Sequence, residues 1–595
     1  MIIDSCVVAV NGDCPEEVSL PDGTRMIAAD VFSGCAKLSS VTIPDSVNVI
    51  GRGAFSRCKG LTRIKLSSAL AALTEDVFAG CSKLDSIVIP RGVEVIGRSA
   101  FNSCTSLRSV EIPIGVIKVD AYAFYGCSSM ASIVIPTTVT TVGDGAFEDC
   151  SSLATVAMPE GLKIIDEETF EGCSSLTHVE IPSTVRSIRR HAFYECVKLE
   201  SIVIPQNVSV VGEYAFYHCR GLRSVKILGG VQTIGDHAFE DCYYLSSVEL
   251  QDGVITVGES AFSRAAIVDL GIPNTVVSIG PYAFSQCKLS TGIRIPDSVK
   301  TIGDWAFANT WARSIRLPNG LQEVGEYAFA CNGAVNSAVI IPESLTNICE
   351  GAFSGCSLTS LDIPESVKTI GRDAFSCTAL RTLVIHNGVE EIGPQAFLCD
   401  EQLRSVYLPL SVVRIGQDAF GDIDHLKTFY VNRGETGRVK EMLEGSGLSV
   451  ENLEFVEVNQ DLSIPPEITG GGVVSIDPTW FARYPMFTDL FGTDVSVALC
   501  KMSGKKDWAG NDMCVWQDYV AGTDPTDVNS VFKAKITIVD GKPKVVWEPN
   551  LNENGVVREY KVFGKENLTD AAWQFPISDQ CKFFKVEVSM PSSDK

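Results

Sequence analysis

The sequence has little positive charge, no long hydrophobic run and few of the features that mark nucleic-acid-binding or membrane proteins. Its 49 Lys and Arg residues are outnumbered by 73 Asp and Glu residues, which gives a formal net charge of −24. Because this field would repel a nucleic-acid duplex, we expect no nucleic-acid partner. No apolar run reaches the roughly 18 residues that a transmembrane helix requires, so we also expect no membrane span.

Short catalytic and cofactor-binding motifs are also missing. The sequence has no G-x-S-x-G, H-E-x-x-H, P-loop or dinucleotide-binding G-x-G-x-x-G pattern. It has 21 cysteines but no C-x-x-C pair of the kind that holds zinc. His191 and His237 hold one repeat position two coils apart, about 10 Å, which is too far for one metal ion. We therefore expect no enzyme, no cofactor and six surface histidines.

What the chain does have is one unit that recurs in eighteen copies. The phenylalanine of its Ala-Phe pair falls at 23-residue steps from Phe32 to Phe262, and at steps of 22 to 24 from there to Phe420. The unit reads L-x-S-V-x-I-P-x-x-V-x-x-I-G-x-x-A-F-x-x-C. A fixed period of this length predicts a repeat solenoid, in which each coil buries its apolar face against its neighbours.

Each apolar position of the unit has a predicted place in the coil, as the copy at 107–127 illustrates. Val110 and Ile112 should point inward from a short strand that Pro113 ends, because proline cannot donate to a ladder. Val116 and Val119 should face the core from the opposite wall. The Ala-Phe pair should pack a short helical or 3₁₀ turn into the interior.

A glycine follows the second apolar pair in most copies. Gly97, Gly143 and Gly235 are examples. We expect this glycine to make a tight corner with a positive φ, a conformation that glycine adopts without steric cost.

Most of the cysteines follow the repeat. Ten of them keep the 23-residue step from Cys35 to Cys242, and Cys287 and Cys356 hold the same place, whereas Cys331, Cys377 and Cys399 lie one residue earlier. One interpretation is a metal ladder or a row of disulfides. We favour a column of buried thiols that behave as small hydrophobes. Each interior cysteine has two equivalent neighbours, and Ala265 and Thr310 replace it.

On these motifs, residues 18–431 resemble the BspA-like class of leucine-rich repeats. The resemblance implies a curved right-handed solenoid of the leucine-rich-repeat type, mainly β, and a role in adhesion to proteins of a host or of neighbouring cells. It also implies a location on the surface of a bacterium. It names no ligand and brings no catalytic residue.

Function on a solenoid is expected at outward positions that vary between coils. On the main strand, the residue between the two inward apolar residues faces outward, and its identity is mixed: apolar, acidic, basic and aromatic. We predict a ligand-binding face from this series, consisting of Val88, Glu111, Val134, Glu180, Val203, Lys226, Glu249, Arg294, Arg316, Tyr407 and Tyr430. Val134 with Val203, and Tyr407 with Tyr430, are the apolar spots of interest.

The ends of the chain differ from the repeat. We divide it into an N-terminal lead or cap (1–17), the solenoid (18–431), a C-terminal cap (432–458) with a helix near 438–443 and a strand at 453–458, and a linker (459–475). A small helical module (476–530) and a β-sandwich of fibronectin or immunoglobulin type (531–595) follow. These two modules are too small to enclose much of a catalytic pocket.

The segment W-Q-D-Y-V-A-G-T-D-P-T-D resembles a C-terminal module of large secreted repeat proteins of the Verrucomicrobia and Lentisphaerae. Related versions carry a calcium loop before that helix. Here only Asp507, Asn511 and Asp512 could serve as ligands, and Lys505 and Trp508 interrupt the pattern. We therefore expect no bound calcium. The resemblance favours a location outside the cell, although 1–10 has no basic region typical of a signal peptide.

The sequence thus predicts a non-enzymatic protein that binds another protein or a cell-surface ligand through its solenoid, outside the cell. The alternative is a structural spacer with no specific ligand. An apolar patch on the exposed sheet would favour binding, and an all-polar sheet would favour the spacer.

Overall fold

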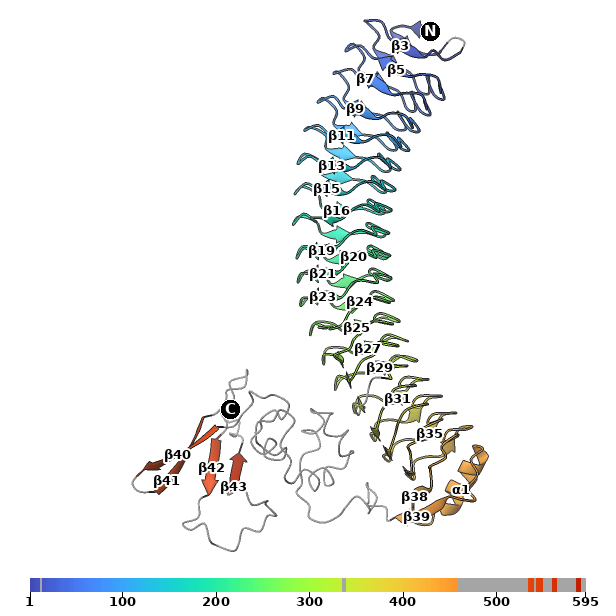
Figure 1. Cartoon of the computed structure of the whole chain (residues 1–595), viewed down its shortest axis with the longest axis vertical. Helices are drawn as coiled ribbons and strands as arrows, with labels where there is room; N and C mark the ends of the chain where they lie inside the picture. The colour runs from blue at the N-terminus through green and yellow to red at the C-terminus, as the bar shows by residue number, and fades with distance from the viewer. Residues whose placement is uncertain are drawn as a thin grey trace.

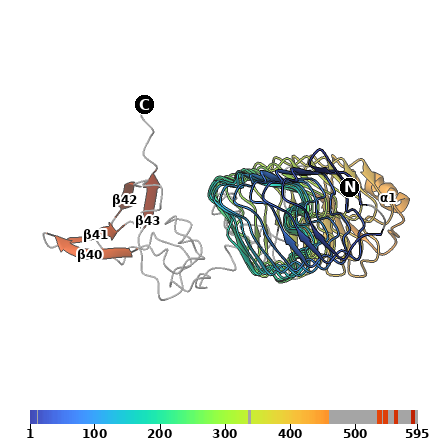
Figure 2. The same ribbon diagram turned by 90° about the horizontal axis from the view of Figure 1, so that it is seen from above.

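The computed structural model describes residues 1–10, 13–333 and 339–458, together with four strand segments at 533–539, 542–548, 559–563 and 585–589. Within 1–458 the chain winds into one long stack of coils that curves between its ends (Figure 1). Viewed along the stack, the coils superpose into a hollow outline that side chains fill (Figure 2). The structure is therefore the predicted solenoid.

The first wall of the stack consists of short parallel strands, one in most coils. Ser109, Val110 and Glu111 of one strand face Ser86, Ile87 and Val88 of the strand before it, and only the middle residue of each is buried. This alternation places the predicted inward and outward residues as expected. The strands are β3 (Glu17–Ser19), β5 (Ser40–Thr42), β7 (Arg63–Lys65), β9 (Ser86–Val88), β11 (Ser109–Glu111), β13 (Ser132–Val134), β15 (Thr155–Ala157), β17 (His178–Val179), β19 (Ser201–Ile204), β21 (Ser224–Ile227), β23 (Ser247–Leu250), β26 (Ile293–Arg294), β28 (Ile315–Arg316), β30 (Val339–Ile340), β32 (Ser360–Ile363), β34 (Thr382–Ile385), β36 (Ser405–Leu408), β38 (Thr428–Asn432) and β39 (Glu454–Val458).

The second wall is a ladder of two-residue strands from the second apolar pair of each unit. Val95 pairs with Lys118 and Ile96 with Val119, and the pattern repeats from coil to coil. Its strands pair in parallel, except for β1 with β2 at the N-terminal end. They are β1 (Ile2–Ile3), β2 (Cys6–Val7), β4 (Met26–Ile27), β6 (Val49–Ile50), β8 (Ala72–Leu73), β10 (Val95–Ile96), β12 (Lys118–Val119), β14 (Thr141–Val142), β16 (Ile164–Ile165), β18 (Ser187–Ile188), β20 (Val210–Val211), β22 (Thr233–Ile234), β24 (Thr256–Val257), β25 (Ser278–Ile279), β27 (Thr301–Ile302), β29 (Glu323–Val324), β31 (Asn347–Ile348), β33 (Thr369–Ile370), β35 (Glu391–Ile392) and β37 (Arg414–Ile415).

The Ala-Phe segment forms turns in place of the predicted short helical or 3₁₀ turn. In the coil of Phe193, residues two before and two after the phenylalanine, His191 and Glu195, have φ of 58° and 56°. The amides of His191, Phe193 and Glu195 donate to carbonyls of the next coil at 2.8–3.1 Å. Left-handed residues rotate successive amides toward the neighbouring coil, so this segment forms a third intercoil ladder and no helix.

The phenylalanines form one continuous stack inside the solenoid. From Phe32 to Phe420, consecutive rings are stacked with centroids 5.0–5.8 Å apart. The rings are buried and join the inward aliphatic residues in one core. The 23-residue period therefore exists because every coil must present its ring at the same height.

The recurring glycine has a different role from the predicted one. Gly97, Gly143 and Gly235 do not have a positive φ. A Cβ on Gly97 would lie 2.6 Å from the Leu73 carbonyl oxygen, and Gly143 and Gly235 are equally close to the backbone of the preceding coil. Glycine is required here because two backbones approach too closely for a side chain.

The cysteine column consists of buried thiols, as we predicted, and they also donate hydrogen bonds. The Sγ of Cys196 lies 3.3 Å from the carbonyl oxygen of Phe170 in the preceding coil. The same contact, at 3.0–3.3 Å, joins each free cysteine of the column to the phenylalanine of the coil before it. Cys35 differs, because it forms a disulfide with Cys14.

The two ends of the stack are closed differently. At the N-terminal end the Cys14–Cys35 disulfide ties the lead to the first coil. At the other end α1 (Thr436–Gly445) packs Val439 and Leu443 on the core, and β39 extends the first wall. The Phe420 ring meets Phe429 edge to face at 5.7 Å, which ends the stack of parallel rings. The cap therefore has the helix and the strand that we predicted.

Beyond the cap, β40 (Lys533–Val539) pairs with β41 (Lys542–Glu548), and β42 (Glu559–Phe563) pairs with β43 (Lys585–Ser589), both antiparallel. These are the strands predicted in 531–595. The linker, the helical module, Asp507, Asn511 and Asp512 lie outside the described residues. Within the described part of the chain, no helix has the length and apolar character needed to cross a bilayer.

Candidate functional site

Most of the predicted ligand-binding face is accessible. Val88, Val134 and Val203 have 82%, 67% and 51% of their surfaces exposed, so they form isolated apolar spots on the first wall. The charged members of the series are exposed or half-buried, and Lys226 and Glu249 form an ion pair of 2.8 Å on adjoining strands. The members that the structure leaves accessible are Val88, Glu111, Val134, Glu180, Val203, Lys226, Glu249, Arg294 and Arg316.

Tyr407 and Tyr430 are the exceptions, and our expectation that they are exposed is wrong. Each side chain has only 5% of its surface exposed, in a cluster with Val456 and Val458 of β39. The amide of Asn432 donates to the Tyr407 hydroxyl at 3.3 Å. Outward positions next to the cap thus belong to the packing of the cap.

A second surface, which the sequence analysis did not single out, gathers aromatic and ionisable side chains on the turn ladder. They come from positions two residues before the phenylalanine and one or two residues after it, in the middle coils. In the first four coils the position two residues before it holds Asp30, Gly53, Asp76 and Ser99. We call this surface the aromatic ridge, and it consists of Tyr122, Tyr125, Glu148, Glu168, Glu171, His191, Tyr194, Tyr214, Tyr217, His218, His237 and Glu240.

The ridge begins with a tyrosine that extends along the stack. The Tyr122 ring meets Tyr125 edge to face at 6.2 Å, and its hydroxyl donates to Glu168 Oε2, two coils further on, at 3.2 Å. A Cβ built on Gly145, in the coil between them, would lie 2.4 Å from the Tyr122 ring. Gly145 therefore leaves room for the ring to lie flat on the next coil.

Rings of histidine and tyrosine continue the ridge over three further coils. His191 lies against Tyr194 at 4.8 Å and edge to face with Tyr214 at 5.3 Å, and Tyr214 stacks on His237 at 4.5 Å. Tyr194 also stacks on Tyr217 at 5.1 Å. Because each ring is fixed by ring contacts on adjoining coils, these side chains are ordered before any ligand binds.

Carboxylates surround these rings and repel one another. Burial, followed by repulsion from Glu168 and Asp149, raises the pKa of Glu148 to about 7. Burial, followed by repulsion from Glu148 and Glu168, raises the pKa of Glu171 to about 7. Burial and then the charge of Arg190 lower the pKa of His191, so this imidazole is neutral at pH 7. The negative charge of this part of the ridge is therefore not balanced by its own histidine.

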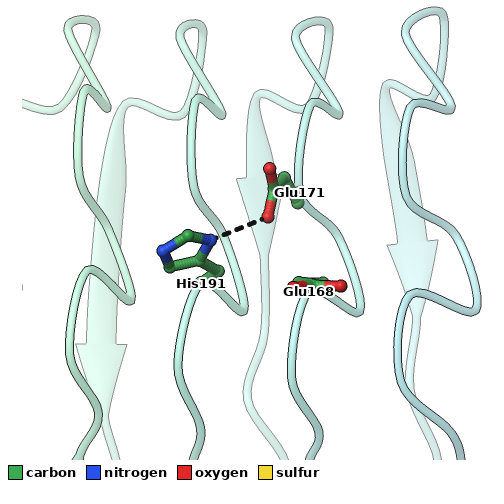
Figure 3. A group of neighbouring side chains, drawn as sticks. All are labelled: Glu168, Glu171 and His191. Atoms are coloured by element: carbon green, nitrogen blue, oxygen red, sulfur yellow. Dashed lines mark hydrogen bonds and ion pairs between the residues drawn. The ribbon is translucent and has the colours of Figure 1, made fainter.

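Three of the ridge residues could hold a divalent cation. Glu168 and Glu171 come from one coil and His191 from the next (Figure 3), and one ligand atom of each lies within 4.8 Å of the others. Two carboxylates and an imidazole are suitable ligands for zinc and related ions. The 3.1 Å hydrogen bond between His191 Nδ1 and Glu171 already accounts for their proximity, so we treat this cluster as part of the ridge.

The other histidines also contact acidic side chains. His218 Nε2 lies 2.8 Å from Asp241, which also binds Arg264 at 3.1 Å, and His237 Nδ1 lies 2.5 Å from Glu240. His386 contacts Asp362 at 2.8 Å, and this hydrogen bond raises the pKa of His386.

The sequence did contain a signal for the ridge. Aligning the repeats on the phenylalanine and reading the position two residues before it gives Tyr122, His191, Tyr214 and His237 within six coils. Tyr282, Trp305 and Tyr327 occupy the same position further along and stack at 6.1 and 4.5 Å. The signal was missed because attention went to the strand, where leucine-rich repeats have their regular sheet.

These walls, ladders and inward rings define a leucine-rich-repeat solenoid. The model of the BspA type leucine rich repeat region (6 copies) matches residues 11–129, 95–223, 209–336 and 331–440, which together span well over half of the chain. The chain therefore belongs to the BspA type leucine-rich repeat family, as its motifs predicted. The family match indicates no enzyme class.

Several solved leucine-rich repeat structures are similar to this chain. One from Bacteroides ovatus is 23% identical, with 74% of this chain and 92% of that chain covered and a TM-score of 0.32. The T. pallidum leucine rich repeat protein is 32% identical over 31% of this chain and 78% of that chain, with a TM-score of 0.24. A leucine rich cell surface protein from Faecalibacterium prausnitzii is 22% identical over 73% and 92%, with a TM-score of 0.25. A comparison with curated proteins gave no match.

Proposed function

We propose that this protein is a non-enzymatic recognition protein, outside a bacterial cell, whose aromatic ridge binds a protein partner through Lys and Arg side chains of that partner. The observation that carries the proposal is the concentration of tyrosine, histidine and glutamate on consecutive coils at positions that hold Asp, Gly and Ser near the N-terminal end of the stack. Nothing in the packing of the core requires these side chains, because the core is the same in every coil.

The aromatic content of the ridge suits protein recognition. Tyrosine provides a large contact area at a low cost in conformational entropy, and it is enriched at the energetic centres of protein interfaces. On the ridge the rings of Tyr194, Tyr214 and Tyr217 are already fixed by one another at 5.1–5.4 Å. Binding would therefore cost little further ordering of these side chains.

The charge of the ridge indicates the chemistry of the partner. Glu148 and Glu171 have raised pKa values because they are desolvated next to other carboxylates. A cationic side chain placed among them would remove this repulsion and would also be attracted to the electron-rich faces of neighbouring rings. The overall charge of −24 would attract such a basic partner at long range.

A location outside the cell is supported by two further points. Leucine-rich repeats of this type are typical of bacterial surface proteins. The Cys14–Cys35 disulfide fits an oxidising compartment, since such bonds are rare in proteins of the reducing cytosol.

The test compares two surfaces of the intact protein. One variant carries Tyr194→Ser, Tyr214→Ser and Tyr217→Ser on the ridge. The matched control carries Val88→Ser, Val134→Ser and Val203→Ser on the first wall. Binding to a panel of purified extracellular-matrix proteins, some basic and some acidic, is measured by surface plasmon resonance at low and high salt. We expect the wild type to bind basic members, with affinity that falls as salt rises.

The ridge variant should bind those basic proteins at least about tenfold more weakly, which corresponds to 1.4 kcal/mol, while the control retains its affinity. Loss in the control alone would move the binding site to the strand face that the sequence predicted. Binding unaffected by either variant would overturn the ridge assignment. An absence of binding to every member of the panel would favour the structural spacer.

A further inference from the structure

Two cysteines outside the buried column are neighbours on adjoining coils. Cys377 and Cys399 each lie two residues after the phenylalanine of their coil and have φ of 55° and 62°. The amide of Cys377 donates to the carbonyl of Leu398 at 2.7 Å, so the two cysteines are in register. Residues that face each other on adjoining parallel strands are about 4.8 Å apart, within the 4.4–6.8 Å Cα separation of disulfides.

This pair differs from the buried column in its surroundings. Cys377 is exposed and Cys399 is partly exposed, whereas the free cysteines of the column are buried. Column thiols donate to phenylalanine carbonyls of the preceding coil, as Cys356 does to Phe329 at 3.1 Å. The column is thus both occupied by hydrogen bonds and shielded from oxidants, and the surface pair is open to them.

The pair is also isolated from other cysteines. The same position holds Gly355 in the coil before Cys377 and Asp422 in the coil after Cys399. Cys331 lies one coil beyond Gly355, about 10 Å from Cys377 by the spacing of the coils. Each of the two thiols therefore has one partner within reach along the described coils, in contrast to the two equivalent neighbours of an interior column cysteine.

The side chains of the pair already interact. Burial, followed by the charge of the neighbouring Cys377 and a hydrogen bond between the two thiols, raises the pKa of the Cys399 thiol. Cys14 and Cys35 show that this chain closes a disulfide across adjoining segments at a Cα separation of 5.3 Å.

We propose that Cys377 and Cys399 form a disulfide that joins two adjoining coils when the protein meets a disulfide oxidant. The oxidant is a small disulfide such as oxidised glutathione, or the active-site disulfide of an oxidoreductase. One cysteine thiolate attacks a sulfur of the oxidant and releases one thiol, which leaves a mixed disulfide. The second cysteine then attacks the mixed disulfide at the protein sulfur and releases the second thiol. The two cysteines lose two hydrogens, and the oxidant gains them.

The location gives this disulfide a structural consequence. Cys377 and Cys399 directly precede Thr378 and Asp400, a buried polar pair in the column. A covalent link at 377 and 399 would hold these two coils together next to a buried carboxyl group. The inference does not depend on the proposed ligand of the ridge.

The test maps thiols in the full chain. The purified protein is reduced, incubated in a glutathione redox buffer, alkylated without denaturant, and digested for mass spectrometry. We expect a cross-linked peptide pair containing Cys377 and Cys399, lighter than the two reduced peptides by two hydrogens, and an alkylated Cys331. Column cysteines should be alkylated only after denaturation. The disulfide of Cys14 and Cys35 is the positive control for the oxidising conditions.

Single variants make the result specific. In Cys377→Ser the Cys399 thiol should become alkylated, and in Cys399→Ser the Cys377 thiol should, while Cys331→Ser should leave the cross-link in place. Circular dichroism verifies that each variant is folded. Alkylation of both Cys377 and Cys399 in a sample where Cys14 and Cys35 are oxidised would overturn the proposal. A cross-link from either cysteine to Cys331 would overturn it as well.

Discussion

Two regions of the same column solve one problem in different ways. Between Cys58 and Cys242 every coil satisfies a phenylalanine carbonyl of the preceding coil with a buried thiol. In the later coils the column also holds the buried residues Thr310, Asn332, Thr378 and Asp400. A thiol costs little to bury and needs no partner of its own. A polar replacement must satisfy both its own groups and those around it, so the later coils depend more strongly on single residues.

Thr310 with Asn332 and Thr378 with Asp400 are the same arrangement at different coils. The Thr310 hydroxyl donates to Asn332 Oδ1 at 2.6 Å, and the Asn332 amide donates to the carbonyls of Phe307 and Phe329 at 2.9 and 2.7 Å. The Thr378 hydroxyl likewise donates to Asp400 Oδ1. An ionised carboxylate has no hydrogen for the phenylalanine carbonyls, and Asp400 Oδ2 has no partner among the described residues.

The largest effect should come from Asn332→Ala. It would remove both donors to the phenylalanine carbonyls and would leave the hydroxyl and amide of Thr310 without their acceptor. Because each buried orphan group costs about 1–3 kcal/mol, we expect a loss of roughly 3–5 kcal/mol from the free energy of unfolding of these coils. Urea unfolding, together with amide hydrogen exchange of residues 307–332, measures it.

Asn332→Cys is the matched control for this substitution. The cysteine would restore one donor toward the Phe307 carbonyl, as elsewhere in the column, but it would not accept from Thr310. Its loss should therefore lie clearly below that of Asn332→Ala. Equal losses would show that the amide contributes no more than a thiol at this position.

The next effect has the opposite sign and concerns Asp400→Asn. Burial raises the pKa of Asp400 to about 8. An unfolded aspartate has a pKa of about 3.9, so between pH 4 and pH 8 the folded carboxyl keeps a proton that the unfolded chain has released. The free energy of unfolding therefore falls as pH rises through this window and levels off above it. We expect Asp400→Asn to raise it by roughly 2 kcal/mol at pH 7.

This pH dependence separates the role of charge from that of shape. The difference in unfolding free energy between Asp400→Asn and the wild type should be smallest near pH 4 and should grow up to pH 8. The amide that this substitution introduces could also donate to the carbonyls of Phe375 and Phe397, as the Asn332 amide does one pair of coils earlier. A difference that stays constant from pH 4 to pH 8 would mean that Asp400 is not protonated in the folded chain.

The repeat period allowed the sequence to predict what every coil shares. It located the inward residues such as Val110 and Val119, the phenylalanine stack and the buried thiols, because these positions have the same environment in each copy. It missed what depends on a neighbour in another coil or in the cap. Gly97 meets the backbone of the preceding coil, and Tyr407 packs with β39. Such contacts follow from the lateral register, which a one-dimensional pattern does not contain.

The candidate site shows the same division. Alternation along the strand correctly placed Val88, Val134 and Val203 on the surface. The ridge was not predicted because left-handed turns bring Tyr122 and Glu168 together from coils two apart. Helical turns, which the sequence analysis expected, would have directed those side chains differently.

The smallest effect tests the thiol side of the comparison. Cys196 is fully buried and its Sγ lies 3.3 Å from the Phe170 carbonyl oxygen. Cys196→Ala would remove one sulfur and one weak donor, so we expect a loss of about 1 kcal/mol in the free energy of unfolding, measured by urea unfolding. Cys196→Ser would keep a donor of similar size. If the hydrogen bond to Phe170 stabilises the coil, the serine variant should be the more stable of the two. If packing alone matters, the serine variant should be no more stable than the alanine variant, because its hydroxyl is costlier to bury.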